Sequence, residues 1–364
     1  MTQSPRARLT VDLDALAHNH AVLREAAAGA EVAPVLKSDA YGLGAGPVAR
    51  RLWAEGARSF FVARLDEGEA LREALTPQRP ATIYLLDGFR DGSGERLAAA
   101  ALTPALSTLA QVAAARDWAA EAGEPLAAAL HVDTGMNRQG LTVDQACALA
   151  AADESLAGLD LRLVMSHLGS AYEVENLRNA RQLAEFMKVR GLFPAAHASL
   201  AASAGIFLGG DYRFDLVRPG VSLFGGGPLG APDERLRAVA TLTAPIVDIR
   251  ELKPGDVIGY GERVQVRKPT RGAVVGAGYA DGVIRAAMDG GYAWFAGARR
   301  PLLIVSMDIL IVDLGDAEAE VGEPVELLGP NALLDDLAGA AGTVAHEVLV
   351  RLSRRAERIY LGEA

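Results

Sequence analysis

Short apolar runs recur through the first 220 residues of the chain, and a helical pattern follows each of them. After the second run, for example, Ala70 and Ala74 alternate with Leu71 and Leu75 at four-residue spacing, which puts these side chains on one face of a helix. The predicted strands cover residues 33–37, 59–63, 82–86, 102–106, 128–132, 161–166, 195–199 and 215–217. Eight strands that alternate with helices predict a parallel (β/α)8 barrel of the TIM type, an α/β fold.

The pattern changes at residues 225–233, where glycine and proline are concentrated (GGGPLGAPD). Such a stretch is typical of a linker. Beyond it, short predicted strands such as 239–249 and 324–328 alternate with turns, and long helical patterns are scarce. We therefore expect two domains, a barrel over residues 1–234 and a mostly β domain over residues 235–364.

Composition narrows the possible classes of protein. The 364 residues include 36 basic and 46 acidic side chains, a net charge of −10, and half of the residues are hydrophobic. This balance excludes a disordered chain and argues against nucleic-acid binding, because no excess of basic residues is available for phosphates. The single cysteine, Cys147, excludes an intrachain disulfide framework. Since we find neither a signal peptide nor a membrane-spanning run, we expect a soluble cytoplasmic protein without a membrane partner.

The predicted barrel gathers reactive side chains at one end. In this fold the catalytic groups follow the carboxyl ends of the strands. That rule selects Lys37, Arg138, His167, Ser203 and Arg218. Each of them alone has an ordinary structural explanation, such as a solvated loop lysine or a hydrogen-bonded core histidine, so their combination carries the prediction of an active site.

The loops after the last two barrel strands commonly bind a phosphate in this fold. Here they provide the Ser203 hydroxyl and the small turn at Gly220 and Val221, whose N–H groups can approach a phosphate closely. A phosphate site together with Lys37 suggests pyridoxal phosphate bound as a Schiff base. A Schiff-base aldolase acting on a sugar phosphate fits the same residues. We find no cluster of histidines and carboxylates that predicts a metal site.

Several sequence blocks resemble the alanine racemases, a family of pyridoxal-phosphate-dependent isomerases. They occur in the family's order over essentially the whole chain: PVLKSDAYGLGA (34–45), HVDTGMNRQG (131–140), SHLGS (166–170), FDLVRPGVSLFG (214–225), GYADG (278–282) and SMD (306–308). The resemblance implies interconversion of L- and D-alanine in a homodimer, with D-alanine supplied to cell-wall peptidoglycan.

The resemblance also implies a role for each matching residue. Lys37 carries the cofactor as an internal aldimine and acts as one catalytic base, while Tyr279 of the partner subunit acts as the other. The remaining implied contacts are Tyr41, Ser203, Gly220 and Val221 with the phosphate, Arg218 backed by His167 with the pyridine nitrogen, and Arg138 and Met307 with the substrate carboxylate. Two opposed bases suit racemisation, which removes a proton from one face of Cα and returns one to the other.

Several positions depart from the pattern common in the family, among them three around the expected site. His131 replaces a lysine that supports the substrate-binding arginine, Tyr172 replaces a frequent acidic residue near the entrance, and Arg354 replaces a tyrosine beside the cofactor. These changes leave the choice of amino acid open. Alternatives are a broad-specificity or serine racemase, a decarboxylase or dehydratase of the same fold, and a barrel-only protein that carries the cofactor without turnover.

Overall fold

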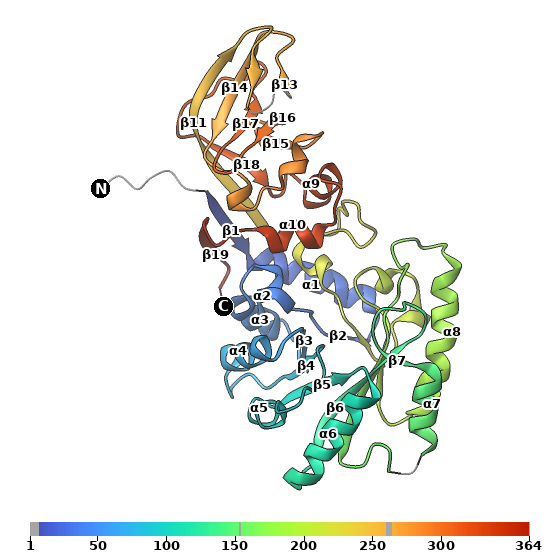
Figure 1. Cartoon of the computed structure of the whole chain (residues 1–364). Helices are drawn as coiled ribbons and strands as arrows, with labels where there is room; N and C mark the ends of the chain where they lie inside the picture. Colours follow the sequence, from blue (N-terminus) through green and yellow to red (C-terminus); the bar gives the residue numbers. More distant parts are fainter. Residues whose placement is uncertain (1–6, 153, 260–263, 364) are drawn as a thin grey trace. The chain divides into compact units, whose positions relative to one another are not determined.

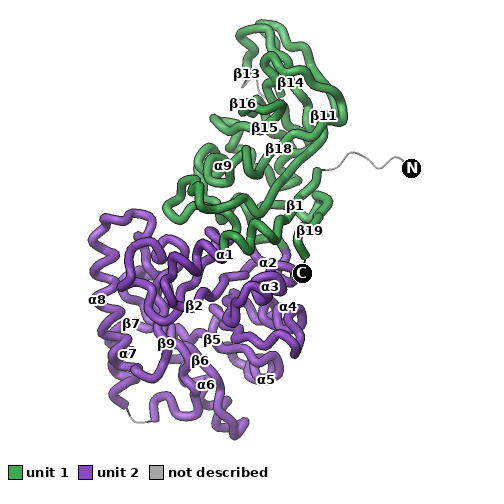
Figure 2. The backbone as a smooth tube through the Cα atoms, turned by 180° about the vertical axis from the view of Figure 1, so that it is seen from behind, with its two compact units in different colours: residues 1–19, 41–43, 224–363 green, residues 20–40, 44–223, 364 purple. Residues whose placement is uncertain are grey.

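The computed structural model describes residues 7–152, 154–259 and 264–363. The chain forms two compact units (Figure 2). The barrel unit comprises residues 20–40 and 44–223, and the β unit comprises residues 1–19, 41–43 and 224–363. This division differs from the expected single boundary after residue 234, because the start of the chain belongs to the β unit.

Eight parallel strands form the barrel unit, which confirms the predicted fold class (Figure 1). The strands β3 to β6, β8 and β9 pair in chain order, β10 pairs with β2, and the parallel bridges Val35–Phe61 and Ala202–Arg218 complete the ring. They are β2 (Glu31–Val32), β3 (Ser59–Val62), β4 (Thr82–Leu85), β5 (Leu102–Leu106), β6 (Leu126–Asp133), β8 (Leu159–Met165), β9 (His197–Ser199) and β10 (Leu216–Val217); a short strand, β7 (Leu141–Thr142), pairs with β6.

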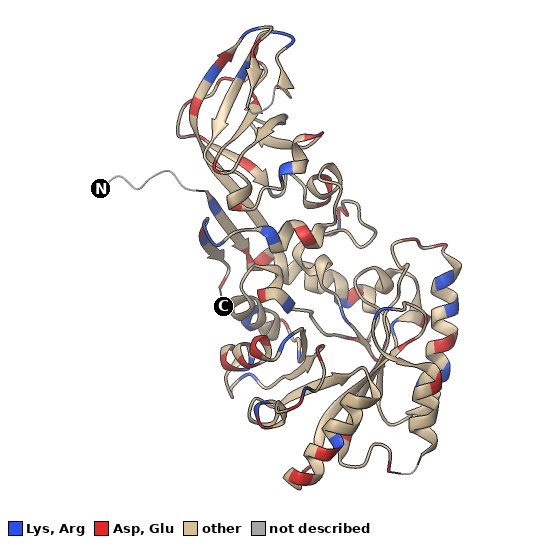
Figure 3. Ribbon diagram, viewed as in Figure 1, with Lys and Arg blue, Asp and Glu red and all other residues tan. Residues whose placement is uncertain are grey.

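Helices connect these strands, as the alternating pattern predicted. Those within the barrel unit are α3 (Ala45–Ala54), α4 (Leu65–Leu75), α5 (Gly94–Ala99), α6 (Leu109–Ala122), α7 (Val143–Ala151) and α8 (Leu177–Leu192), and α1 (Leu13–Ala27) is divided between the two units. Charges of both signs follow one another along α8, for example Arg181, Glu185 and Lys188 (Figure 3). In the described part of the chain, no helix has the length and apolarity needed to cross a membrane.

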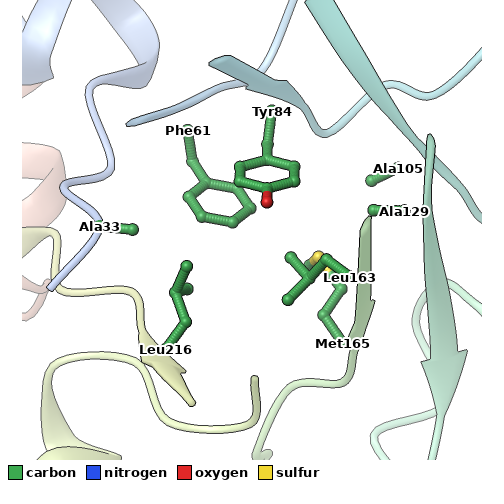
Figure 4. Packing of buried hydrophobic residues seen from close by; sticks show 8 residues of the cluster. All are labelled: Ala33, Phe61, Tyr84, Ala105, Ala129, Leu163, Met165 and Leu216. Carbon is green, nitrogen blue, oxygen red and sulfur yellow. The ribbon is translucent and has the colours of Figure 1, made fainter. Parts of the chain in front are cut away.

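Inward-facing side chains of the strands fill the barrel (Figure 4). Phe61 and Tyr84 are the two large members, and their rings stack with centroids 4.6 Å apart. Smaller residues, such as Ala105 and Ala129, lie at the neighbouring strands, so that large and small side chains complement each other. Truncation of a buried aromatic residue costs about 3–5 kcal/mol, so this core stabilises the scaffold that carries the strand ends.

The β unit is a closed antiparallel barrel of six strands. The long strand β11 (Ala240–Leu252) pairs with β18 (Pro324–Leu328) at one end and with β14 (Thr270–Val275) at the other, and β17 (Leu310–Asp313), β16 (Ala298–Val305) and β15 (Tyr292–Phe295) complete the ring. Buried and less buried positions alternate along the first half of β11, as expected for a strand with one face in a core.

Two further strands explain why the start of the chain belongs to the β unit. β1 (Arg8–Asp12) pairs antiparallel with β11 and parallel with β19 (Glu357–Leu361), so it joins both ends of the chain into one sheet. The other elements of this unit are the strands β12 (Val257–Ile258) and β13 (Val264–Gln265) and the helices α9 (Leu334–Ala340) and α10 (Ala345–Arg351).

Candidate active site

Lys37 lies directly before a left-handed helical turn. The segment α2 (Lys37–Tyr41) has φ angles of 55°, 56°, 53° and 57° at Ser38, Asp39, Ala40 and Tyr41. Left-handed helical conformation costs roughly 1–2 kcal/mol for each residue that is not glycine. The surrounding structure must therefore hold the turn in place.

Hydrogen bonds fix this turn at both ends. The Ser38 N–H donates to Oε1 of Glu67 at 2.7 Å, and the Ala45 N–H donates to Oδ1 of Asp39, also at 2.7 Å. A bond of 2.9 Å from the Ala40 N–H to the Leu36 carbonyl spans the turn. The sequence does not predict this conformation, because none of the four residues is a glycine.

The environment of Lys37 favours its neutral amine. Burial lowers the pKa of Lys37, Arg138 lowers it further, and the negative charge of Glu67 opposes both effects. A neutral amine is the form that attacks a carbonyl and that accepts a proton. The interaction with Arg138 also shows that these two predicted site residues lie close enough to influence each other.

Arg218 is buried and is held by neutral acceptors. Its Nη1 donates to Oγ of Ser199 at 2.5 Å, and its Nη2 donates to the carbonyl of Ser166 at 2.5 Å. The same Nη2 lies 3.4 Å from both the Leu200 carbonyl and Nδ1 of His167. Burial lowers the pKa of Arg218 to about 10. Among the described residues, these bonds engage only Nη1 and Nη2, which leaves Nε for a further acceptor.

The contact with Arg218 defines which ring nitrogen of His167 carries the proton. A guanidinium can only donate, so Nδ1 of His167 must accept, and the ring proton lies on Nε2. Burial holds the pKa of His167 well below its usual range, and Arg218 lowers it further. The imidazole is therefore neutral near pH 7. The structure brings these two predicted residues together.

Ser203 and the turn after β10 form a small polar cradle. The hydroxyl oxygen of Ser203 accepts the N–H of Gly220 at 3.0 Å and that of Ser222 at 3.4 Å. Ser222 is fully buried, and its Oγ has no hydrogen-bond partner among the described residues. A short 3-10 helix begins at Val221. The cradle fits a phosphate, because an anion can accept from buried hydroxyls and from N–H groups at a helix start.

The sequence does not single out Ser222. Serine is common in loops, and nothing in its spacing separates Ser222 from other loop serines. Only the buried hydroxyl without a partner distinguishes it, and that is visible in the fold alone.

Arg138 lies in an exposed loop that several side chains hold. Oδ1 of Asp133 accepts the N–H groups of Gly135 and Met136, both at 2.8 Å. From α8, Nη2 of Arg178 donates to the carbonyls of Gly135 at 2.8 Å and Met136 at 3.3 Å. The loop is therefore ordered although the Arg138 side chain faces solvent.

His131, one of the departures, lies buried at the end of β6. Its Nδ1 is 3.4 Å from Oγ of Ser107, and Ser107 accepts a hydrogen bond from Nε2 of Gln139 at 3.1 Å. Burial lowers the pKa of His131 to about 4, with smaller contributions from Arg218 and Arg138. A neutral imidazole thus lies where the family often carries a lysine.

Tyr279 and Met307 lie side by side in the β unit. The Tyr279 N–H donates to the Ser306 carbonyl and the Ala280 N–H donates to the Met307 carbonyl, both at 3.0 Å. A Cβ on Gly278 would lie 2.3 Å from the Ser306 carbonyl oxygen, so this close approach requires glycine. Tyr279 is 43% exposed and Met307 is 53% exposed, which leaves both side chains accessible.

The other site candidates are distributed between the units. Tyr41 belongs to the β unit, where its buried ring packs against Phe224 and His346 at centroid distances of 5.1 and 5.7 Å. Tyr172 of the barrel unit and Arg354 of the β unit are exposed.

A cavity of about 940 Å³ lies at the opposite end of the barrel. Glu31, Thr82 and His197, the first residues of their strands, line it. Catalytic groups in this fold lie at the carboxyl ends, where Lys37 and Arg218 are found, so we do not assign the reaction to this cavity.

The fold and the barrel site define a two-domain barrel protein with a lysine, a buried arginine and a phosphate cradle at the carboxyl ends of its strands. Family models for the alanine racemase N-terminal and C-terminal domains match residues 11–228 and 239–360. The chain belongs to the alanine racemase family.

Individual relatives agree with this assignment. An alanine racemase of Methylobacterium nodulans is 44% identical over 99% of this chain and 97% of its own length. A catabolic alanine racemase of Agrobacterium fabrum is 40% identical over 97% of this chain and 92% of its own. The crystal structure of alanine racemase from Bartonella henselae with covalently bound pyridoxal phosphate is 33% identical, covers 98% of this chain and 100% of its own, and has a TM-score of 0.92.

Proposed function

We propose that this protein is a pyridoxal-phosphate-dependent isomerase that interconverts L- and D-alanine. The observation that carries the proposal is the barrel site, where Lys37 with its lowered pKa, the buried Arg218 and the Ser203 cradle follow the carboxyl ends of the strands. Family membership supports the same reaction.

The residues present fit the cofactor. Lys37 would bind it covalently, Ser203, Gly220, Val221 and Tyr41 would hold its phosphate, and Nε of Arg218 would donate to its ring nitrogen. When bound, the cofactor supplies an electron sink that makes the Cα–H bond of an amino acid acidic. Because Arg218 is cationic near neutral pH, with a pKa of about 10, it disfavours protonation of the ring nitrogen, which limits competing reactions.

Proton transfer at Cα requires a base on each face. We assign one face to Lys37, since its lowered pKa favours the neutral amine. We assign the other to Tyr279 of a partner subunit, with Arg138 and Met307 orienting the substrate carboxylate. The exposure of Tyr279 and Met307, side by side on the β unit, supports a role in another copy's site.

Replacement of Lys37 tests the assignment directly. Lys37→Ala should lose the visible absorbance of the covalently bound cofactor as well as activity, whereas Lys188→Ala, at an exposed position of α8, should keep both. Tyr279→Phe should bind the cofactor normally and lose turnover. Full activity of Tyr279→Phe would overturn the two-base assignment.

The products distinguish the proposed reaction from its alternatives. Deuterium from the solvent should enter Cα of alanine from either enantiomer. A panel of amino acids analysed by chiral chromatography would reveal a broad-specificity or serine racemase. Release of carbon dioxide or ammonia would indicate a decarboxylase or dehydratase instead.

We propose that the D-alanine formed supplies cell-wall peptidoglycan. A second role, the breakdown of D-alanine, is favoured by relatives named catabolic alanine racemases. Deletion of the gene in its own host separates the two. A requirement for added D-alanine supports the biosynthetic role, and loss of growth on alanine as carbon source supports the catabolic one.

A further inference from the structure

Glu67 connects the lysine-bearing turn to the neighbouring strand and helix of the barrel. We propose that Glu67 is a positioning residue, whose carboxylate holds the left-handed turn after β2 and so fixes the direction in which Lys37 is presented. The proposal rests on the function proposed above for Lys37.

The carboxylate of Glu67 accepts three backbone N–H groups. Its Oε2 accepts those of Ala63 at 2.8 Å and Arg64 at 3.1 Å, and thereby caps its own helix, α4. Its Oε1 accepts the Ser38 N–H at 2.7 Å. One side chain thus joins the end of β3, the start of α4 and the turn that follows Lys37.

Glu67 influences the backbone of Lys37 through the N–H group of Ser38, to which it is bonded. The Ser38 N–H belongs to the peptide plane that leaves Lys37, so this bond restrains ψ of Lys37 together with φ of Ser38. Ser38 has a φ of 55°, which its side chain disfavours. The bond between Asp39 and Ala45 holds the far end of the turn, and Glu67 holds the end beside the lysine.

The negative charge of Glu67 also acts on the Lys37 amine. It raises the pKa of Lys37, against the effects of burial and of Arg138. Geometry alone nevertheless defines the proposed role, since the bond to Ser38 would restrain the turn whatever the protonation state of the lysine.

Two substitutions test the restraint in the full-length protein, saturated with pyridoxal phosphate for hydrogen exchange and titrated from the cofactor-free form for binding. Glu67→Gln has a single acceptor oxygen, which should remain on the N–H groups of Ala63 and Arg64 just before its own helix, while Glu67→Ala has none. The matched control is Glu69→Gln, because Glu69 lies on the same helix and its carboxylate bonds Arg96 at the surface.

Hydrogen exchange followed by mass spectrometry reports on the turn itself. In both Glu67 variants, amides in a peptide spanning residues 34–42 should exchange about tenfold faster, and the half-saturating concentration of pyridoxal phosphate should rise about tenfold. A factor of about ten corresponds to the free energy of one hydrogen bond to a charged group. Glu69→Gln should match the wild-type protein. Wild-type exchange of this peptide in both Glu67 variants would overturn the proposal.

A rescue variant separates positioning from helix capping. Glycine adopts a φ of 55° without steric cost, so adding Ser38→Gly to Glu67→Gln should restore part of the lost cofactor affinity, while the N–H at position 38, which still lacks its acceptor, continues to exchange fast. A residue that only caps α4 would show faster exchange confined to residues 64–75 and no rescue, and that result would refute the positioning role. These readouts stay informative if Lys37→Ala contradicts the proposed function, because they follow the turn and not turnover.

Discussion

The residues of this site differ in whether the sequence alone reveals them. Lys37, Arg138, His167, Ser203 and Arg218 could be selected from the sequence, because the barrel rule relates chain position to the carboxyl ends of strands. The tautomer of His167, the bond from Ser38 to Glu67 and the buried Ser222 hydroxyl, which has no partner among the described residues, could not, since each depends on how segments far apart in the chain fold together.

His131 provides a prediction at this scale. Its pKa is about 4 in the folded protein and 6.5 in its ordinary state. Below pH 6.5 the unfolded chain binds a proton that the folded chain excludes, so stability from this residue is complete above pH 6.5 and falls as the pH decreases toward 4. The slope is about 1.4 kcal/mol per pH unit for one proton.

Urea unfolding at pH 7.5 and pH 5.5 measures this effect. Between these values, His131→Gln should lose less free energy of unfolding than the wild-type protein, by about 1.4 kcal/mol. His197→Gln, at an exposed position of β9, should keep the wild-type difference. Equal pH dependence of His131→Gln and the wild-type protein would show that the unfolding free energy is not linked to His131.

At the scale of elements, the regular spacing of apolar residues predicts strands and helices, whereas a strained turn leaves no such pattern in the sequence. Seven of the eight barrel strands overlap their predicted ranges, because apolar runs alternate with helical patterns, whereas the first was predicted at residues 33–37 and lies at Glu31–Val32. The left-handed turn after β2 could not, because Ser38, Asp39 and Ala40 carry no local signal for positive φ and adopt it only under restraint by Glu67 and other distant groups.

Helix α8 restrains the loop of Arg138 in a comparable way. Arg178 donates from α8 to the carbonyls of Gly135 and Met136, so Arg178→Met should loosen the loop that presents Arg138. If Arg138 binds the substrate carboxylate, the KM for alanine should rise about tenfold. This factor corresponds to the free energy of one charge-assisted hydrogen bond. The visible spectrum of the bound cofactor should stay unchanged.

The exposed Arg181 of the same helix is the matched control. Arg181→Met should leave the KM at its wild-type value. An unchanged KM in Arg178→Met would mean that the Arg138 loop keeps its conformation without this contact, or that Arg138 does not bind the substrate.

At the scale of the whole molecule, the chain's ends share one sheet. The expected boundary after residue 234 followed the Gly/Pro-rich stretch, a local signal. The pairing of β1 with β11 and β19 joins residues more than 200 positions apart, and no local sequence pattern predicts it. The same limit applies to subunit contacts, which no single chain reveals by its periodicity.

Mixed dimers test whether Tyr279 serves the site of a partner. Lys37→Ala and Tyr279→Phe should each be inactive, because every site then lacks one base. In a mixed dimer, however, the intact lysine of one subunit meets the intact tyrosine of the other, so one of its two sites is complete. Random reassembly makes half of the dimers mixed, and activity should recover to about one quarter of the wild-type value. If both bases belonged to one chain, no mixture would recover activity, and a dilute monomer would remain as active as the assembled protein.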